Sequence, residues 1–115
     1  MTDNYIPDRG DVVWINMNPQ AGHEQTGRRP AVVLSPYPYN AKVGLALFSP
    51  ISTRVKGYPF EVILPKGFKI TGAILSDQVK SLDWKARNVE FFDKIPESIT
   101  LEILTKLATL LRIDK

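Results

Sequence analysis

Residues 22–34 read GHEQTGRRPAVVL, a polar segment bounded by glycines that runs directly into an apolar run. The apolar part, AVVL, contains two β-branched residues and predicts a buried strand. The polar part gathers an imidazole, a carboxylate, a carboxamide and two guanidiniums within seven residues. Such a set can hold a phosphodiester and move a proton beside it. Because loops at strand ends commonly carry function, this segment is the first candidate for a functional site.

Short apolar segments on both sides of this stretch predict further strands. They are rich in Val, Ile, Phe and Trp and are separated by Gly, Pro and Asn, which indicates a small β-barrel. Near the end of the chain, apolar residues recur at helical spacing, with acidic Glu97 before them and basic Arg112 after them. We therefore expect a C-terminal helix that starts at Glu97 and Ser98, finishes at Arg112 to Lys115 and packs on the barrel. The expected strands are residues 10–16, 31–35, 45–49, 60–64 and 73–82, with a helical turn within residues 38–42 and residues 83–88 left unassigned.

Length and composition limit the possible functions. The 115 residues suit a single domain, residues 1–115, whose site is shallow unless a second subunit deepens it, so a dimer is expected. The chain has no cysteine, one histidine and no clustered carboxylates, so we expect neither a metal nor another cofactor. The N-terminus lacks a signal-peptide pattern, and no apolar run is long enough to span a bilayer, which predicts a cytoplasmic protein. A net charge of +3 permits a nucleic-acid partner.

Four blocks of sequence, in the right order, resemble the MazF/PemK family of toxin ribonucleases, and the MazF branch most. They are YIPDRGD at residues 5–11, GHEQTGRRPAVVLSP at 22–36, KGYPFEV at 56–62 and DQVKS at 77–81. The resemblance implies an SH3-like antiparallel β-barrel of the CcdB/PemK-like toxin type, and a homodimer. It also implies metal-independent, sequence-specific endoribonuclease activity on single-stranded RNA, which inhibits translation and growth when mRNA is cut. A cognate MazE-like antitoxin with an acidic, disordered tail would occupy the RNA groove.

A metal-free ribonuclease can use the 2′-hydroxyl of the RNA as nucleophile, leaving a 2′,3′-cyclic phosphate and a 5′-hydroxyl end. Arg29 is the candidate cation for the pentacoordinate phosphorus, because a guanidinium can hold two phosphate oxygens, and the resemblance assigns it catalysis. Arg28 is expected to be a solvated loop charge or an ion-pair partner of Glu24. In the family a threonine follows the strand at 45–49, and alignment through Pro50 places Ser52 there, with Thr53 next. Either hydroxyl can donate to the scissile phosphate, or the pair can cap the turn.

The proton-transfer groups come from the first loop. His23 titrates near neutrality and can act as base or acid, while Glu24 can orient Arg29, assist as base or form a surface ion pair. PemK-like relatives combine a loop histidine with a strand arginine and an aspartate. His23 and Asp77 match that set, but Leu75 replaces the arginine, so Arg29 and the Ser52–Thr53 turn carry more of the expected reaction.

RNA binding is assigned to carboxamides that can hydrogen-bond base edges and to cations along the groove. Tyr37 and Tyr39 can stack on bases, but core or interface packing is the stronger expectation for both. We assign Trp14 and the phenylalanines Phe60, Phe91 and Phe92 to packing. The RNA-binding candidates are Gln25, Arg54, Lys56, Asp77, Gln78 and Lys80.

Two other functions fit a barrel of this shape. CcdB-like toxins poison a topoisomerase through a C-terminal tryptophan, whereas this chain ends RIDK. A non-catalytic RNA-binding domain would use the same basic loop. The RNA sequence that is recognised, the class of RNA, the antitoxin and the division of proton transfer between Ser52, Thr53 and His23 are left open at this stage.

Overall fold

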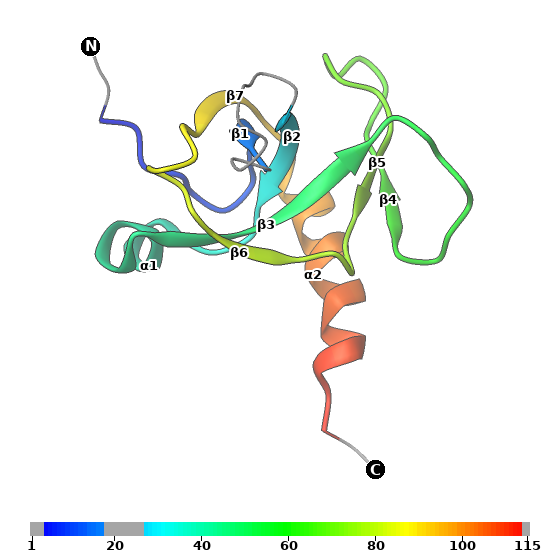
Figure 1. The fold of residues 1–115 in the computed structure, drawn as a ribbon. Coiled ribbons are helices and arrows are strands. Elements are labelled where there is room, and N and C mark those ends of the chain that lie inside the picture. The colour runs from blue at the N-terminus through cyan, green and yellow to red at the C-terminus, as the bar shows by residue number, and fades with distance from the viewer. Residues whose placement is uncertain (1–3, 18–26, 114–115) are drawn as a thin grey trace.

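The computed structural model describes residues 4–17 and 27–113. Its strands form a curved sheet, with a short helix near one end and a long C-terminal helix that projects from the body (Figure 1). In chain order the elements are β1 (Asp11–Asn16), β2 (Arg28–Val33), α1 (Tyr37–Val43), β3 (Leu45–Ser52), β4 (Glu61–Ile63), β5 (Ala73–Leu75), β6 (Lys80–Asp83), β7 (Glu90–Lys94) and α2 (Glu97–Leu111).

Strand β3 joins the two parts of this antiparallel sheet. On one edge, residues 48–50 of β3 pair with residues 31–33 of β2. On the other edge, residues 45–48 pair with β6, and residues 51–52 pair with β5. The strand order is β4-β5-β3-β2-β1-β7, with β6 beside β3. The expected mainly β fold with a terminal helix is confirmed, but among the described residues no pairing joins β4 to β7, so the barrel is open.

Three details differ from the sequence prediction. The segment 73–82 forms two strands, because Ser76 and Gln78 bond back to Phe60 and Leu75 and make a turn between them. Strand β3 continues through Pro50 to Ser52. Strand β7 was not expected, since its sequence EFFDK lacks clear alternation. Phe91 on β7, which was assigned to packing, contacts Tyr5 edge-on with ring centroids 5.8 Å apart, while 49% of it stays exposed.

Both faces of the sheet bury apolar side chains, because neighbouring residues of a strand point to opposite sides. Val12 and Val32 face the side covered by α2, and Val13 and Val33 face the other side. The first cluster consists of Val12, Val32, Leu34, Ile51, Val62, Leu64, Ile74, Ile95 and Ile103, and the second of Val13, Ile15, Ala31, Val33, Ala46, Phe48 and Trp84. The ends of β2 and β3 are therefore held rigidly by packing on both sides.

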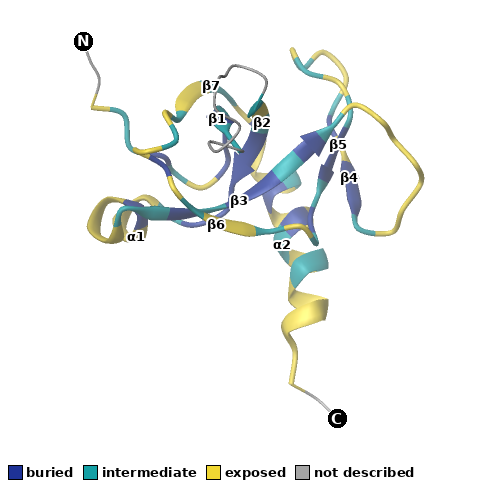
Figure 2. Cartoon of the chain, in the orientation of Figure 1, coloured by how far each residue is buried: buried dark blue, intermediate teal, exposed yellow. Residues whose placement is uncertain are grey.

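Helix α2 packs against the core as far as Leu107, and its last turn is exposed. Ile103 is fully buried, whereas Leu110 and Leu111 are 53% and 67% exposed. Figure 2 shows the same change from buried to exposed along the helix. The predicted C-terminal helix packed on the barrel is confirmed. Of the helices described, neither has the length and apolarity that crossing a membrane requires.

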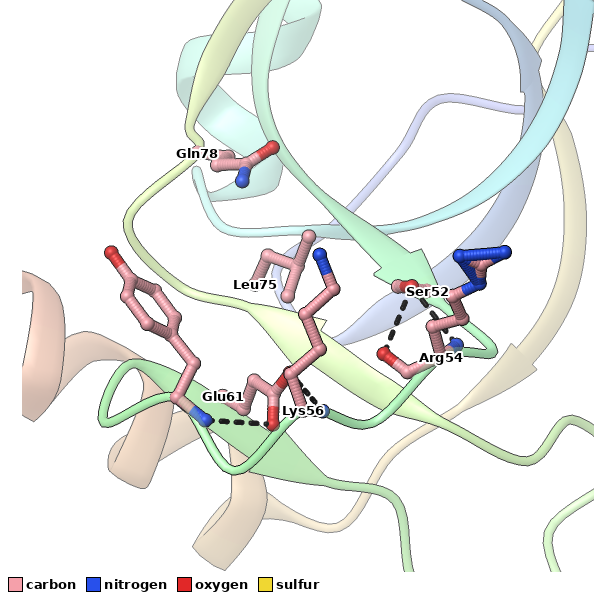
Figure 3. Close-up of a pocket in the computed structure, with 7 residues that line it drawn as sticks. Ser52, Arg54, Lys56, Glu61, Leu75 and Gln78 are labelled. Carbon is pink, nitrogen blue, oxygen red and sulfur yellow. Dashed lines mark hydrogen bonds between the residues drawn. The ribbon is translucent and has the colours of Figure 1, made fainter.

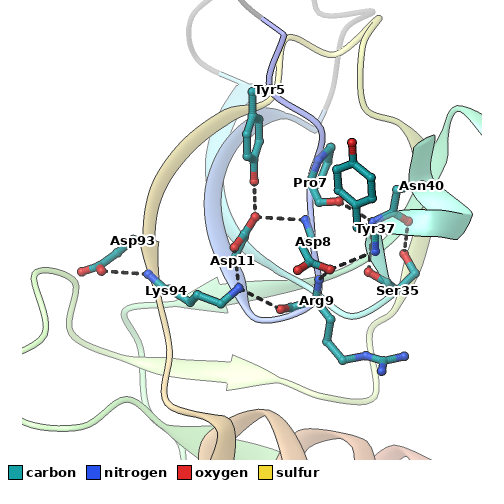
Figure 4. A network of polar contacts seen from close by, with 10 residues as sticks. All are labelled: Tyr5, Pro7, Asp8, Arg9, Asp11, Ser35, Tyr37, Asn40, Asp93 and Lys94. Carbon is teal, nitrogen blue, oxygen red and sulfur yellow. Dashed lines mark hydrogen bonds and ion pairs between the residues drawn. The ribbon is translucent and has the colours of Figure 1, made fainter.

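The first motif block, residues 5–11, anchors the N-terminal segment (Figure 4). The Asp11 carboxylate accepts a hydrogen bond from the Tyr5 hydroxyl at 2.6 Å and pairs with the Lys94 ammonium at 2.9 Å. Burial, followed by the bond to Asp11, raises the pKa of Tyr5 above its ordinary value. This block therefore has a structural role and lies outside the site described below.

Asn40 on α1 completes the anchor from inside the core. Its side chain is fully buried, and its amide nitrogen donates to the Pro7 and Ser35 carbonyls at 2.8 and 3.0 Å. Its amide oxygen accepts from the Ser35 hydroxyl at 2.6 Å, and its backbone carbonyl accepts from the Trp84 indole. The buried carboxamide thus ties Pro7 and Ser35 to α1, and the backbone carbonyl of Asn40 adds the contact with Trp84.

We expect Asn40→Ala to lower the free energy of unfolding by about 2–3 kcal/mol, because it leaves buried carbonyls without a donor. Urea unfolding followed by circular dichroism measures the change. Lys42→Ala, at an exposed position of the same helix, is the control and should stay within about 0.5 kcal/mol of wild type. Equal stabilities of the two variants would contradict the role given to Asn40.

Candidate active site

Two adjoining hollows lie where β2, β3 and the turn after β5 meet. The larger, about 540 Å³ and here called the main groove, is lined by Trp14, Met17, Arg29, Pro30, Pro50, Ile51, Ser52, Thr53, Arg54, Ile70, Leu75, Gln78 and Lys80. The smaller, about 340 Å³ and here called the side pocket, is lined by Ser52, Arg54, Lys56, Tyr58, Glu61, Leu75 and Gln78 (Figure 3). Four residues line both hollows, so the two form one continuous depression.

Arg29 is exposed near the start of β2 and lines the main groove. The pairing of β2 with β3 ends at Ala31 and Pro50, and just beyond that end of the pair Arg29 and Ser52 line the main groove together. Within the described residues its guanidinium has no recorded hydrogen-bond or ion-pair partner, so its donors are available to a ligand. Arg28 differs, because it pairs with Glu90 and donates to the Asn88 carbonyl at 3.1 Å. The ion pair of Arg28 is formed with Glu90, whereas the partner expected from the sequence, Glu24, lies outside the described residues.

The Ser52–Thr53 turn also lines the main groove. The Ser52 hydroxyl accepts from the Arg54 amide at 3.1 Å and donates to the Arg54 carbonyl at 3.3 Å (Figure 3). The capping role considered for this turn is therefore present at Ser52. Gly72 lets the neighbouring backbone approach, since a Cβ there would lie 2.2 Å from the Ser52 carbonyl oxygen. The hydroxyl-bearing turn is thus fixed by the end of β3 and by close backbone packing.

Basic side chains surround both hollows. Arg54 lines the main groove and the side pocket, Lys56 lines the side pocket, and Lys80 on β6 lines the main groove. All three are exposed, as is Arg29. Four cations around one depression favour a polyanionic ligand.

The two residues of the turn after β5 differ in where they point. Gln78 lines both hollows and leaves its carboxamide open to a ligand. Asp77 does not line either hollow; its carboxylate accepts a hydrogen bond from the Tyr58 hydroxyl at 2.6 Å. This bond is the main cause that raises the pKa of Tyr58. The structure thus brings Arg29, Ser52, Thr53, Arg54, Lys56, Gln78 and Lys80 together and sets Asp77 behind them.

Three expected site residues, His23, Glu24 and Gln25, lie outside the described residues. The chain on either side of this segment is described, and there the Met17 amide donates to the Gly27 carbonyl at 2.8 Å. Met17 itself lines the main groove. The polar loop therefore leaves and rejoins the described structure beside the candidate site.

Several lining residues were not found from the sequence. Trp14 was assigned to packing alone; it contacts Phe92 edge-on with ring centroids 5.8 Å apart, but it also lines the main groove. Tyr58, within the motif KGYPFEV, was not predicted as a lining residue, because no pattern in that segment indicates its contact with Asp77. Tyr37 and Tyr39 are exposed on α1, at the other end of β3 from Ser52, so they are neither core residues nor groove residues.

Comparison with known proteins agrees with this geometry. Residues 8–111 match the family model of the PemK-like, MazF-like toxin of type II toxin–antitoxin systems. The chain belongs to this family. It is 53% identical over 87 residues to the endoribonuclease toxin MazF of Escherichia coli K12, covering 76% of this chain and 78% of MazF. It is 34% identical over 110 residues to the E. coli endoribonuclease PemK, covering 90% of this chain and 81% of PemK.

Solved structures agree with the same assignment. A crystal structure of MazF from Deinococcus radiodurans superposes with a TM-score of 0.85 at 49% identity, covering 94% of this chain and 98% of that one. A crystal structure of MazE-MazF from the same organism gives a TM-score of 0.85 at 41% identity, covering 96% and 100%. The expected family, its fold and the endoribonuclease class are confirmed.

In this MazF-like toxin the block KGYPFEV shapes the loop beside the side pocket. The Glu61 carboxylate is only 9% exposed and accepts hydrogen bonds from the backbone amides of Lys56, Gly57 and Tyr58 at 2.9–3.3 Å. These bonds, led by the Lys56 amide, lower the pKa of Glu61 below its ordinary value of 4.5. The Glu61 carboxylate is thereby bonded within the loop, and the cationic side chains stay exposed on the loop surface.

The lowered pKa predicts a pH dependence of stability. An ionised Glu61 stabilises the folded state above the unfolded-state pKa, and this contribution is lost as the pH falls through the lower folded-state pKa. We expect Glu61→Gln to unfold more easily at neutral pH and to show a smaller loss of stability than wild type between about pH 5 and pH 3. Urea unfolding at a series of pH values measures both effects. Glu102→Gln, at an exposed position of α2, controls for loss of one carboxylate, and a slope for Glu61→Gln equal to wild type would contradict the argument.

Proposed function

We propose that this toxin cuts single-stranded mRNA at specific sequences, without a metal, and so inhibits translation and growth in the cytoplasm. The observation that carries this proposal is the guanidinium of Arg29, which has no partner among the described residues and lines the main groove together with the Ser52–Thr53 turn and further cations. The endoribonuclease names of the E. coli relatives support the substrate class. The chemistry follows from the side chains of the groove.

The reaction begins when the 2′-oxygen of the RNA attacks the neighbouring phosphorus atom. The bond from phosphorus to the 5′-oxygen then breaks, leaving a 2′,3′-cyclic phosphate and a 5′-hydroxyl end. A base takes the 2′-hydroxyl proton and an acid protonates the departing 5′-oxygen; His23 and Glu24 are assigned these two transfers. Arg29 stabilises the charge that develops on the non-bridging oxygens, because its fork of N–H donors matches two of them.

A hydroxyl of the turn adds a further donor to the phosphate. Ser52 lines the main groove together with Arg29, and its proton is held only by a 3.3 Å bond to the Arg54 carbonyl. That long bond can be exchanged for a bond to a phosphate oxygen while the Arg54 amide still orients the hydroxyl. Thr53 is exposed beside it and is the alternative donor. We assign the main role to Ser52.

The groove also suits the expected partners. A MazE-like antitoxin with an acidic, disordered tail would bind the same cations as the RNA backbone, and the solved MazE-MazF structure of D. radiodurans supports such a partner. A homodimer would deepen a groove that is shallow in one chain. Gln25 and Gln78 would then read base edges, and Arg54, Lys56 and Lys80 would bind the phosphates.

We expect Arg29→Ala to reduce RNA cleavage by at least about a hundredfold, because it removes the cation that stabilises the reacting phosphate. Labelled single-stranded RNA, incubated with chelator, measures the rate and shows whether a metal is needed. Arg28→Ala is the matched control and should cut at nearly the wild-type rate, since Arg28 pairs with Glu90. Normal cutting by a folded Arg29→Ala protein would overturn the assignment, and RNA binding without any cutting by wild type would indicate an RNA-binding module instead.

We expect RNA and antitoxin to compete for the groove cations. Lys56→Glu/Lys80→Glu should weaken both ligands together, by about tenfold or more at low salt, and binding of both should weaken as salt rises. A competition titration with a cleavage-resistant RNA and the cognate antitoxin measures the two affinities. Lys42→Glu/Lys85→Glu carries the same charge change at exposed positions outside both hollows and should change the affinities less. Simultaneous binding of RNA and antitoxin would show that their sites do not overlap.

A further inference from the structure

Tyr58 gives the side pocket an aromatic wall. Its side chain is 44% exposed, lines the side pocket and packs at a tilt against Phe60, with ring centroids 5.8 Å apart. Leu75 adds an apolar surface to the same pocket, and Gln78 adds a carboxamide. At about 340 Å³ the pocket lies within the range of small-molecule sites, about 300–1,000 Å³. An aromatic ring, an apolar surface and a carboxamide are the groups that bind an unstacked nucleobase.

The Tyr58 ring is held before any ligand arrives. Its hydroxyl donates to the Asp77 carboxylate at 2.6 Å, and its backbone amide is fixed by Glu61. The next residue, Pro59, is tied to α2, because the Lys106 ammonium donates to its carbonyl at 2.8 Å. A ring held by its hydroxyl, on a backbone that is itself held on both sides, loses little conformational freedom when a base stacks on it.

Asp77 acts through Tyr58. One of its carboxylate oxygens is used by the Tyr58 hydroxyl, and the other is buried and, within residues 4–17 and 27–113, has no hydrogen-bond partner. Neither hollow is lined by Asp77, and a carboxylate would repel an RNA backbone. This geometry favours a positioning role for Asp77 over the direct contact with RNA that the sequence predicted.

From this geometry we propose that the side pocket is a subsite for one nucleobase, with Tyr58 as its stacking wall and Asp77 as the group that orients Tyr58. Four residues line both the side pocket and the main groove. The base in the side pocket therefore belongs to a nucleotide close to the scissile phosphate. The subsite rests on the proposed ribonuclease function and adds to it the place where one base is held.

The test is a scan with abasic RNA. The substrate is a short single-stranded RNA that spans a mapped cleavage site and carries a 2′-O-methyl group at the attacking nucleotide, so that it binds without being cut. In a set of such RNAs, each lacks one base. Wild type should lose about tenfold in affinity at one position near the scissile phosphate, as expected for a lost stack. Tyr58→Ala should bind the intact RNA about tenfold more weakly and lose nothing more at that position, while it still responds to the other abasic positions.

Three further variants separate stacking from positioning. Tyr58→Phe keeps the ring but loses the bond to Asp77, so it should lose less affinity than Tyr58→Ala. The RNA affinity of Asp77→Ala should match that of Tyr58→Phe. The double variant Tyr58→Phe/Asp77→Ala should bind RNA no more weakly than either single variant. Asp77→Asn keeps a side-chain carbonyl that can accept the Tyr58 hydroxyl, and it should restore most of the binding. Tyr39→Ala, at a similarly exposed tyrosine on α1, should bind like wild type.

The outcomes distinguish the subsite from the function. If wild type cuts RNA but Tyr58→Ala weakens every abasic RNA by the same factor, or has no effect, the subsite is wrong and the ribonuclease function stands. If Asp77→Asn binds as weakly as Asp77→Ala, the positioning role is wrong. If wild type neither cuts nor binds RNA, the proposed function and the subsite both fail.

Discussion

The pairing of β3 on both of its edges determines where the site residues lie. Strand β2 on one edge brings Arg29 to the groove at the end of β3, and strand β5 on the other edge leads into the turn that carries Gln78. Ile51, just before Ser52, is buried in the core cluster that α2 covers. The hydroxyl, the guanidinium and the carboxamide therefore converge because one strand is paired twice, and not because they are near in sequence.

The carboxylates near the site form hydrogen bonds within the protein, and the cations near the site are exposed. Glu61 accepts three backbone amides inside its loop, and Asp77 accepts the Tyr58 hydroxyl. Glu61 thus lines the side pocket with its carboxylate already bonded to backbone amides, and Asp77 lines neither hollow. The cations beside them, such as Arg54 and Lys56, are exposed and lack carboxylate partners among the described residues. A modest net charge of +3 is in this way concentrated on the surface where a polyanion would bind.

The sequence predicted the parts of this structure that depend on local patterns. The strand at residues 10–16 and the C-terminal helix follow from apolar spacing, and Arg29 and Ser52 follow from motifs that the family shares. Strand β7 was missed because it is defined by pairing with β1 rather than by its own alternation. The bond between Tyr58 and Asp77 joins residues 19 apart across two strands, and no single segment contains a signal for it.

The loop beside the side pocket links the site to the stability of the whole fold. It is held by Glu61 at the start of β4, by Asp77 after β5 and by Lys106 on α2, so its shape depends on three elements that meet only in the folded chain. Ile103, one turn before Lys106, is fully buried in the core. Loosening α2 would therefore move an anchor of the loop as well as uncover the core. In a site this open to solvent, the order needed for base recognition comes from anchors outside the groove, and the groove residues themselves can stay exposed for RNA.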